Sequence, residues 1–449
     1  MTQSMEIQKK PLDIVIVGGS LAGLMCGIVL RDAGHTIRIL EQGDNERQSH
    51  MAGVCLGPSA GVFLAQHDRH SRPFFKRTLR LLVLATSGAI RFFVKGRRDM
   101  TSWDAYYFRL RSNFDAYISS YYPRPPLSSE RDGSVSYETH TKVVDLASDG
   151  DDRSKMRLSV LNLESQDTSE LQADLIIGAD GPDSFVRNKY LPHVQREYAG
   201  YIAWRGTVPE SHVSDATRKL IEQGPTVHLM HRNHCVIYSI PGPNGTLESG
   251  ERFFNFLWYT NQSQQDLDEI LVDSIDGHRH HNTVPAGRVQ QKSWNRQLEL
   301  AQAAPFPSPF LEIIMKIERP FIQVVTHLCS PQATFEGGKV LLIGDALSLY
   351  CPHTALSGTQ AAFHSMATEK YVSGEITLQE YERKVLRYSH LYWSQSIWWG
   401  RFYQRHILVA FWSGLYYWAS FGINRIRSWS AGMRQRAGTA PEIADEYAT

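Results

Sequence analysis

The most constraining feature of the sequence is a glycine-rich turn between an apolar strand and an apolar helix near the N-terminus. Residues 12–18 have the composition of a short buried strand, and residues 21–33 have that of a helix. A second strand is expected at 36–41. A strand, a tight turn, a helix and a second strand form the βαβ unit that opens a Rossmann-type fold. The sequence therefore predicts an α/β fold that binds a dinucleotide.

The turn itself contains the small residues that phosphate binding requires. Gly18, Gly19, Ala22 and Gly23 allow a tight turn, close approach of a pyrophosphate and packing of the helix on the strand. Ser20 stands where the pattern has its middle glycine. Its small side chain leaves less room for a pyrophosphate but does not exclude one. We expect the amides at the start of the helix to face the phosphates, since the helix dipole favours negative charge there.

Glu41 follows the second expected strand, where a carboxylate accepts hydrogen bonds from an adenosine ribose. Its negative charge disfavours a 2′-phosphate at the same place. A plain strand-end carboxylate is the alternative. The fingerprint alone does not distinguish FAD from NAD.

Bulk properties limit the classes of function. A chain of 449 residues is too long for one simple core, so we expect two domains. Lys plus Arg number 47 and Asp plus Glu number 46, so no broad field attracts nucleic acid. The five cysteines form no C-x-x-C pair, and His278, His280 and His281 follow each other closely in a polar loop; we expect no metal site. The polar N-terminus predicts an intracellular, cytoplasmic location.

Two further strands end in paired Gly and Asp residues. The first segment contains Gly178, Asp180, Gly181, Ser184 and Arg187 and matches the pattern G-A-D-G-x-x-S-x-V-R. This pattern resembles the D-G segment of FAD-dependent aromatic hydroxylases, the flavoprotein monooxygenases of the p-hydroxybenzoate hydroxylase type.

The second segment resembles the G-D-A segment of the same family. Gly344 and Asp345 end a strand, and the resemblance implies that this Asp reaches the ribityl chain of FAD. Pro352 follows in the region that abuts the flavin ring in the family. The family continues after this proline as Pro-x-x-G-x-G, whereas here Gly358 is the one glycine within residues 353–358. An arginine that contacts FAD in many relatives has no clear counterpart here. Arg109 is the substitute that we expect, and Arg111 is the alternative.

The resemblance covers the chain to about residue 375 and implies a fold. It implies a Rossmann-type FAD-binding domain, an inserted, mostly antiparallel substrate-binding sheet and a C-terminal helical region. Strands at 135–146, 157–163 and 173–178 would return the chain beside the first strand. The aromatic-rich residues 198–259 would form the inserted sheet. The expected FAD-binding parts are 1–85, 97–195 and 318–375, the substrate-binding parts are 86–96 and 196–317, and the helical region is 376–449.

Residues 101–104, 199–209 and 352–355 look most like the 2,6-dihydroxypyridine 3-hydroxylase branch of the family. This resemblance implies that NAD(P)H reduces FAD and that O2 forms a flavin hydroperoxide, which hydroxylates an electron-rich aromatic or heteroaromatic molecule. Tyr201, Arg205 and His353 are the catalytic candidates by position, with Tyr238 and Trp258 as further pocket candidates. Tyr201 could instead fill the core of the sheet, Arg205 could pair with a structural carboxylate, and His353 could bond the loop backbone.

Other functions remain open from the sequence. The same cofactor could serve an epoxidase or an oxidative decarboxylase that acts on a secondary metabolite. A non-catalytic nucleotide-binding protein that presents its aromatic C-terminal surface to a partner is the alternative from another class.

The C-terminal region is helical in pattern and rich in aromatic residues. Residues 407–423 contain no charged side chain, which reaches the lower limit for a membrane-spanning segment. Packing against the body or a second copy is one interpretation, and peripheral contact with a membrane is the other.

Overall fold

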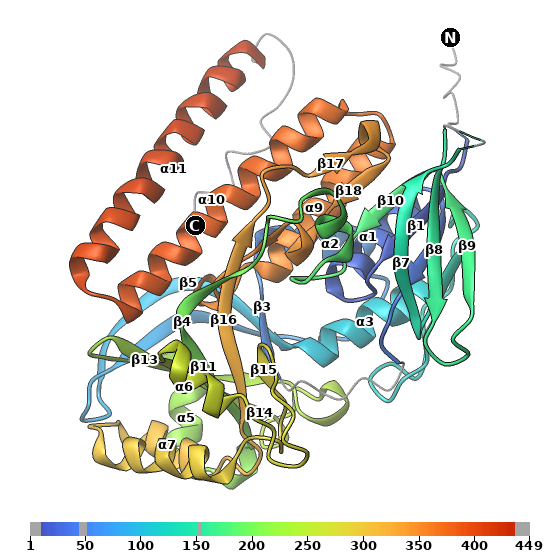
Figure 1. Ribbon diagram of the computed structural model, residues 1–449. Helices are drawn as coiled ribbons and strands as arrows, with labels where there is room; N and C mark the ends of the chain where they lie inside the picture. The colour runs from blue at the N-terminus through green and yellow to red at the C-terminus, as the bar shows by residue number, and fades with distance from the viewer. Residues whose placement is uncertain (1–9, 45–51, 151, 153, 436–449) are drawn as a thin grey trace.

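The computed structural model describes residues 10–44, 52–150, 152 and 154–435. Within these residues a six-stranded sheet has the order β17-β18-β10-β1-β2-β6 and is parallel except for its β17 edge (Figure 1). Its strands are β1 (Asp13–Val17), β2 (Thr36–Leu40), β6 (Val135–Glu138), β10 (Leu175–Gly178), β17 (Thr334–Phe335) and β18 (Val340–Leu342).

The expected βαβ unit is present, with β1 and β2 joined by α1 (Leu21–Asp32). α1 packs against α3 (Trp103–Asp115) and α9 (Ser357–Val372). α3 ends where Ala116 adopts a left-handed conformation (φ 56°). The shorter helices nearby are α2 (Pro58–His67) and α4 (Phe185–Tyr190).

One part of the predicted strand arrangement is wrong. Only β10 returns beside β1, and β6 pairs with β2. A separate antiparallel sheet is formed by β7 (Thr141–Ser148), β8 (Met156–Asn162) and β9 (Thr168–Ala173). The physical reason is that β7 alternates between buried and exposed side chains and β9 is largely exposed. Such strands cover one face of a core, whereas strands inside a parallel sheet are buried on both faces.

The second large sheet has ten strands and is mostly antiparallel, as predicted (Figure 1). It draws on more of the chain than 86–96 and 196–317, since β3, β4 and β16 also belong to it. Its strands are β3 (Gly53–Leu56), β4 (Lys76–Leu84), β5 (Ile90–Ser102), β11 (Glu197–Pro209), β12 (Thr226–Met230), β13 (Asn233–Ile240), β14 (Phe253–Asn261), β15 (Thr283–Val284), β16 (Phe321–Cys329) and β19 (Ser348–Leu349).

The two faces of this sheet have different neighbours. Trp204, Phe256 and Trp258 lie on one face, in a core with residues of α7 and α8. Tyr201 and Tyr259 lie on the opposite face, with Cys351. The alternation follows from the two-residue period of a strand. The helices of this part are α5 (Asp215–Ile221), α6 (Gln264–Ile270), α7 (Gln291–Ala303) and α8 (Ser308–Met315).

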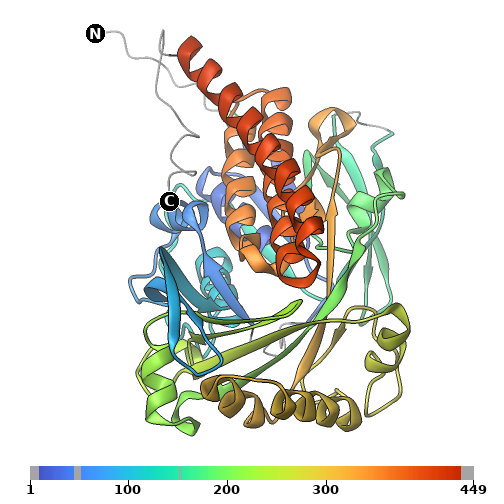
Figure 2. The same ribbon diagram turned by 90° about the vertical axis from the view of Figure 1, so that its left-hand side faces the viewer.

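Two long helices end the described chain, α10 (Leu378–Gln404) and α11 (Ile407–Gln435). They lie side by side along one flank of the molecule (Figures 1 and 2). α10 begins with a capping box in which Thr377 and Glu380 satisfy each other's backbone amides. Among the described residues, no helix combines the length and the apolar character that are needed to cross a bilayer.

Candidate active site

A single cavity of about 2180 Å³ connects the six-stranded sheet with the large sheet. The predicted residues that line it are Gly18, Ser20, Ala22, Glu41, Asp180, Gly181, Arg205, Gly344, Asp345, Pro352, His353 and Gly358. Gly19, Gly23, Arg109 and Tyr201 are not among its lining residues. Residues separated by hundreds of positions in the sequence therefore share one binding space.

The glycine turn is sterically fixed at two positions. Gly18 has φ +100°, and a Cβ there would lie 2.5 Å from the carbonyl oxygen of Ala179. A Cβ on Gly23 would collide with the carbonyl oxygen of Gly18. Ser20, in contrast, has an ordinary φ of −86° at the N-cap of α1, so its backbone does not need a glycine. The serine changes only the space next to the cavity.

The opposite side of the turn is held by side chains. Glu41 accepts hydrogen bonds from the amides of Gly19 and Gly43, both at 2.8 Å. Tyr137 donates to the carbonyl oxygen of Gly19 at 2.9 Å, and the guanidinium of Arg111 lies 3.6 Å from the centre of the Tyr137 ring. Glu41 thus stabilises the turn and also lines the cavity. The sequence analysis missed Tyr137, because nothing in its local pattern indicates this distant contact.

Asp180 follows β10 at the carboxyl edge of the parallel sheet. One carboxylate oxygen accepts a hydrogen bond from the amide of Val186 at 3.1 Å. The other oxygen is buried and has no hydrogen-bond partner among the described residues. Burial raises the pKa of this carboxyl group above its ordinary value. A buried acceptor beside a cavity is suited to a ligand hydroxyl or amide that would supply the missing hydrogen bond.

Asp345 follows β18 at the same edge and also lines the cavity. Burial raises the pKa of its carboxyl group to about 6. The preceding residue, Gly344, donates its amide proton to Nδ1 of His364 at 3.0 Å. Burial lowers the pKa of His364 to about 3, so its imidazole is neutral, and Nε2 can donate to Ser389 at 3.1 Å. His364 is a positioning residue that the sequence analysis missed.

Arg187 joins the two motif segments. Its guanidinium donates to the carbonyl oxygens of Pro182 at 2.6 Å and Ala346 at 2.9 Å, directly after Gly181 and Asp345 in the sequence. The side chain is 1% exposed. Arg187 therefore holds the turn that contains Asp180 and the turn that contains Asp345 at a fixed separation. It is not among the lining residues of the cavity.

The loop after Pro352 explains how a departure from the family sequence is accommodated. Ala355 stands where the family has its first glycine, and it adopts the left-handed conformation that a glycine would take (φ 54°, ψ 33°). α9 begins two residues later and contains Gly358 in its first turn. The loop thus keeps its backbone path with an alanine, at a conformational cost.

Replacing Ala355 by glycine is expected to raise the free energy of unfolding by about 0.5–1 kcal/mol, because the left-handed strain is larger than the extra entropy of the unfolded glycine chain. Urea unfolding of the two proteins measures this difference. The same substitution at Ala65, in the helical interior of α2, serves as the control and is expected to destabilise by a similar amount. A loss of stability in Ala355→Gly would contradict the strain argument.

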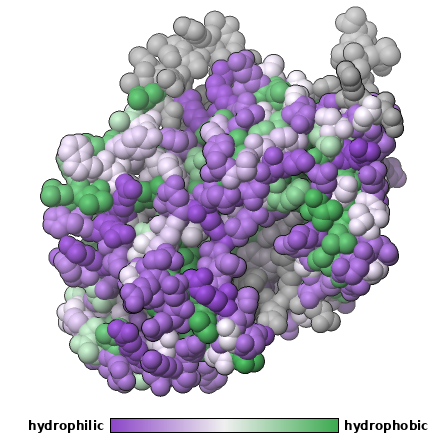
Figure 3. All heavy atoms as spheres, in the orientation of Figure 1, coloured by the Kyte–Doolittle hydropathy of each residue, from purple (hydrophilic) through white to green (hydrophobic). Residues whose placement is uncertain are grey.

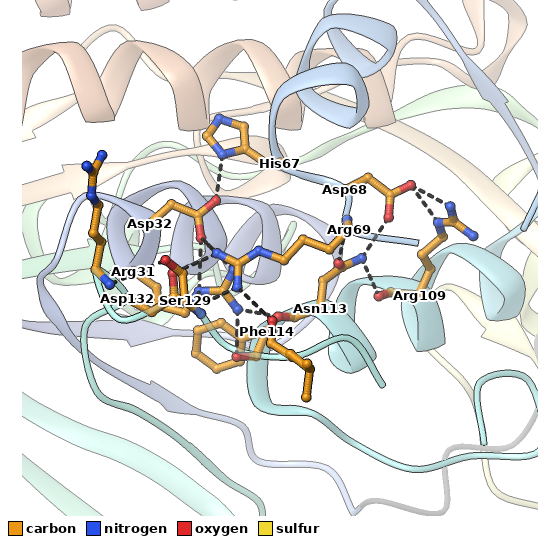
Figure 4. A network of polar contacts seen from close by, with 12 residues as sticks. Arg31, Asp32, His67, Asp68, Arg69, Arg109, Asn113, Phe114, Ser129 and Asp132 are labelled. Atoms are coloured by element: carbon orange, nitrogen blue, oxygen red, sulfur yellow. Dashed lines mark hydrogen bonds and ion pairs between the residues drawn. The ribbon is translucent and has the colours of Figure 1, made fainter. Parts of the chain in front are cut away.

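Arg109, which we expected at the cofactor, has another role in the structure. It forms an ion pair with Asp68 at 2.6 Å (Figure 4). It also donates to the carbonyl oxygens of His70 and Arg72. With its guanidinium saturated and turned away from the cavity, Arg109 braces the segment after α2 against α3. The same network contains Arg31, Asp32, His67, Arg69, Asn113 and Asp132 (Figure 4).

On the substrate side, Arg205 reaches the cavity from β11. Its Nη1 donates to Gln323 at 2.8 Å, and its guanidinium lies over the ring of Phe321, 5.0 Å from the centre. The Nε atom is buried and has no partner among the described residues. Arg205 forms no ion pair in the described part of the chain, so the structural carboxylate that we considered for it is not found there. A positive group with an unused donor is available to a ligand oxygen.

Tyr201 and His353 form a pair across the junction of the two domains. The Tyr201 hydroxyl and His353 Nε2 are 2.7 Å apart. Burial raises the pKa of Tyr201 well above its ordinary value and lowers that of His353 to about 3. His353 is thus neutral, and its buried Nδ1 has no hydrogen-bond partner among the described residues. Tyr201 holds the imidazole from behind, and His353 faces the cavity.

Aromatic residues that the sequence analysis missed complete this wall. His234 stacks on Tyr259 and on Tyr403, with ring centres 4.7 and 4.2 Å apart. Trp399 stacks on Tyr403 in turn. Trp258, which we considered for the pocket, belongs to the opposite face of the sheet. Tyr238 does line the cavity and accepts a hydrogen bond from Asn255 at 3.0 Å.

Comparison with known sequences shows which proteins this chain resembles. Residues 13–59 match a family described as FAD binding domain, and residues 198–327 match one described as FAD binding domain-like. The 2,6-dihydroxypyridine 3-monooxygenase of Paenarthrobacter nicotinovorans is 28% identical over 388 residues, which cover 84% of this chain and 88% of that protein. The chain is therefore similar to the FAD-binding monooxygenases over most of its length.

Solved structures share the fold of this chain. The 2,6-dihydroxypyridine-3-hydroxylase from Arthrobacter nicotinovorans aligns with a TM-score of 0.73 at 24% identity, over 87% of this chain and 93% of that one. HpxO of Klebsiella pneumoniae, in complex with FAD and uric acid, aligns with a TM-score of 0.64 at 14% identity, over 91% and 92% of the two chains.

The residues that line the cavity fit FAD. Its volume exceeds that of a typical small-ligand pocket, as a dinucleotide together with a substrate requires. The glycine turn and the start of α1 suit a pyrophosphate, and Glu41 is placed for the ribose. The unpartnered oxygen of Asp180 and the carboxylate of Asp345 are acceptors for polar groups of the cofactor. At the two departures from the family sequence, Ser20 has an ordinary φ and Ala355 takes the left-handed conformation that a glycine would take.

Proposed function

We propose that the protein is a single-component hydroxylase that uses NAD(P)H and O2 to hydroxylate an electron-rich aromatic or heteroaromatic molecule. One observation carries the proposal: the cavity that contains the FAD-binding motifs continues into an aromatic chamber on the large sheet. The names of the relatives, which include a dihydroxypyridine hydroxylase and a salicylate hydroxylase, support an aromatic substrate.

Bound FAD, reduced by the nicotinamide cofactor, would supply the activated oxygen. The residues of this chain position the ring and keep water away. Arg205 offers its unpartnered Nε to a ring hydroxyl or phenolate oxygen, and a phenolate is the more reactive form. The stacked rings of Tyr259, His234 and Tyr403 form an apolar wall beside it.

His353 serves as a hydrogen-bonding group and not as a general base. A group with a pKa of about 3 holds almost no protons at neutral pH and accepts one weakly. Its Nδ1 can nevertheless bond a ring substituent, with the tautomer set by Tyr201 on the other side. Substrate ionisation would therefore depend on the positive charge of Arg205.

Replacing His353 by glutamine is expected to raise KM for the ring substrate about tenfold and to leave the pH dependence of kcat between pH 6 and 8 unchanged, because the lost group does not titrate in that range. Steady-state kinetics at several pH values provide the measurement. Tyr201→Phe, which removes only the hydroxyl behind His353, should give a smaller rise. The disappearance of a titration step near pH 7 in His353→Gln would show that His353 is a base after all.

The proposed function is tested by the absorbance spectrum of the purified protein, followed by anaerobic reduction with NADH and with NADPH. A panel of hydroxylated pyridines, phenols and prenylated aromatics is added to each reaction. The expected result is a flavin spectrum that one class of ring bleaches much faster than the others. A colourless protein that also fails to take up added FAD would overturn the proposal.

A further inference from the structure

The outer face of α11 exposes a continuous set of large apolar side chains. Trp412 is 70% exposed, and Ile407 and Leu408 are each 62% exposed. Figure 3 shows hydrophobic side chains at the left edge of the molecule, over the lower end of α11. The exposed apolar residues of this helix are Ile407, Leu408, Val409, Phe411, Trp412, Leu415, Tyr416, Trp418 and Ile423. We call them the α11 face.

The orientation of α11 is fixed by its inner side. Tyr417 stacks on Trp398 of α10 with ring centres 5.4 Å apart, and its hydroxyl accepts a hydrogen bond from Gln395 at 3.0 Å. Gly414 lets the two helices approach closely, since a Cβ there would lie 2.8 Å from Trp398 Nε1. Most of the α11 face therefore points away from the body, while Tyr416 and Trp418 at its edges also contact α10. Rotation of the helix cannot bury the face without breaking these contacts.

In the sequence around this face, the charged side chains are all positive. The sequence contains no Asp or Glu between Glu382 and Glu442. The charged residues in between are Arg383, Lys384, Arg387, Arg401, Arg405, Arg425, Arg427, Arg434 and Arg436. A second copy docked through the α11 face would bring like charges together with no carboxylate of this stretch to pair with them. An anionic surface would be attracted instead.

A second apolar element lies on the same flank of the molecule. The β4–β5 hairpin exposes Ile90, Phe92, Phe93 and Val94 near its turn. Both views place this hairpin and α11 on the flank that is at the left in Figure 1 (Figures 1 and 2). Val94 of β5 and Trp418 of α11 also line the same cavity. The hairpin tip and the α11 face thus flank the outer end of the cavity.

We propose that the α11 face and the tip of the β4–β5 hairpin dock the protein on an anionic lipid surface, with α11 lying in the plane of the interface. Trp and Tyr side chains with flanking arginines are the composition that favours the headgroup boundary. An interfacial helix needs one apolar face and no membrane-spanning length, which agrees with the hydropathy of α11. Because Trp418 belongs to both the face and the cavity wall, an apolar ligand can pass from the lipid to the cavity.

The test is co-sedimentation of the FAD-loaded full-length protein with vesicles of phosphatidylcholine alone or with one quarter phosphatidylglycerol. We expect binding to the anionic vesicles to be about tenfold stronger and to fall when NaCl is raised from about 50 to 500 mM. The double variant Leu408→Glu/Trp412→Glu should lose this binding. Both side chains are exposed, so the variant should keep its flavin absorbance and its melting temperature.

The matched control introduces the same charge at apolar residues that are exposed elsewhere. Leu127 is 92% exposed and Ile275 is 71% exposed, and Leu127→Glu/Ile275→Glu should bind vesicles like the unmodified protein. Three results would overturn the proposal. These are a protein that stays in solution with the anionic vesicles, a Leu408→Glu/Trp412→Glu variant that still binds them, and a dimer in light scattering that this variant converts to a monomer. The last result would assign the face to a second copy.

Discussion

Asp345→Asn is expected to make the FAD-free protein more stable at pH 8 and to weaken its affinity for FAD. The pKa of the carboxyl group is raised from 3.8 to about 6 by burial, so the folded state holds this proton more tightly than the unfolded state. Its stabilising contribution is fully present below about pH 4 and is lost as the pH rises through about 6. Above that range the folded protein contains a buried charge that the asparagine variant lacks.

The expected gain in the free energy of unfolding is about 1–3 kcal/mol at pH 8 and close to zero at pH 4. FAD affinity should fall about 10- to 100-fold, because a charged acceptor for a hydroxyl of the cofactor is replaced by a neutral amide. Urea unfolding of the apoprotein at both pH values and fluorescence titration with FAD measure the two effects.

Asp183→Asn is the matched control, since Asp183 also lines the cavity but is exposed and pairs with Arg196. It should change neither quantity substantially. If Asp345→Asn lowered stability at pH 8 while leaving FAD binding intact, the carboxylate would be a structural residue and its assignment to the cofactor would be wrong.

Arg187→Met is expected to reduce the free energy of unfolding by about 3–5 kcal/mol and to weaken FAD binding as a consequence. Methionine retains much of the volume but leaves the carbonyl oxygens of Pro182, Val194 and Ala346 without their donor. Of these three contacts, the one with Ala346 is fully buried. Two of these carbonyls adjoin the turns that contain Asp180 and Asp345. Chemical unfolding and FAD titration of the same preparations provide the measurement.

Arg38→Met is the control for the loss of an arginine, because Arg38 is 43% exposed and pairs with Glu138 at the surface. Its effect should be below about 1 kcal/mol. Arg187→Lys should be intermediate, since lysine keeps the charge but cannot reach several carbonyls at once. Equal stabilities of Arg187→Met and Arg38→Met would show that the bridge between the two motif segments contributes nothing.

The residues that we expect at the cofactor lie within short sequence motifs, and the structure brings most of them to one cavity. Gly18, Glu41, Asp180 and Asp345 each follow a strand, and the carboxyl ends of parallel strands meet at one edge of the sheet. Arg109 was wrongly expected there, because its real partners come from the segment after α2, about 40 positions earlier in the sequence.

The substrate side was less accessible. Tyr201 and Arg205 were named by position, but their role depends on which face of β11 each occupies, and a shift of one residue in register would exchange the faces. Trp258 shows the consequence, because it lies in the core beneath the sheet. Tyr403 and Trp399 belong to α10, and no local pattern connects a C-terminal helix to the cavity wall.

The sequence by itself determined the class of fold and the position of the glycine turn, because strand and helix periodicity and short glycine motifs are local properties. Only the tertiary structure decided the pairing of β7, β8 and β9, the bridge made by Arg187, the Tyr201–His353 pair and the outward orientation of α11. Each of these depends on contacts between distant segments. Such contacts are selected by burial and hydrogen-bond satisfaction in the folded chain, and no local spacing encodes them.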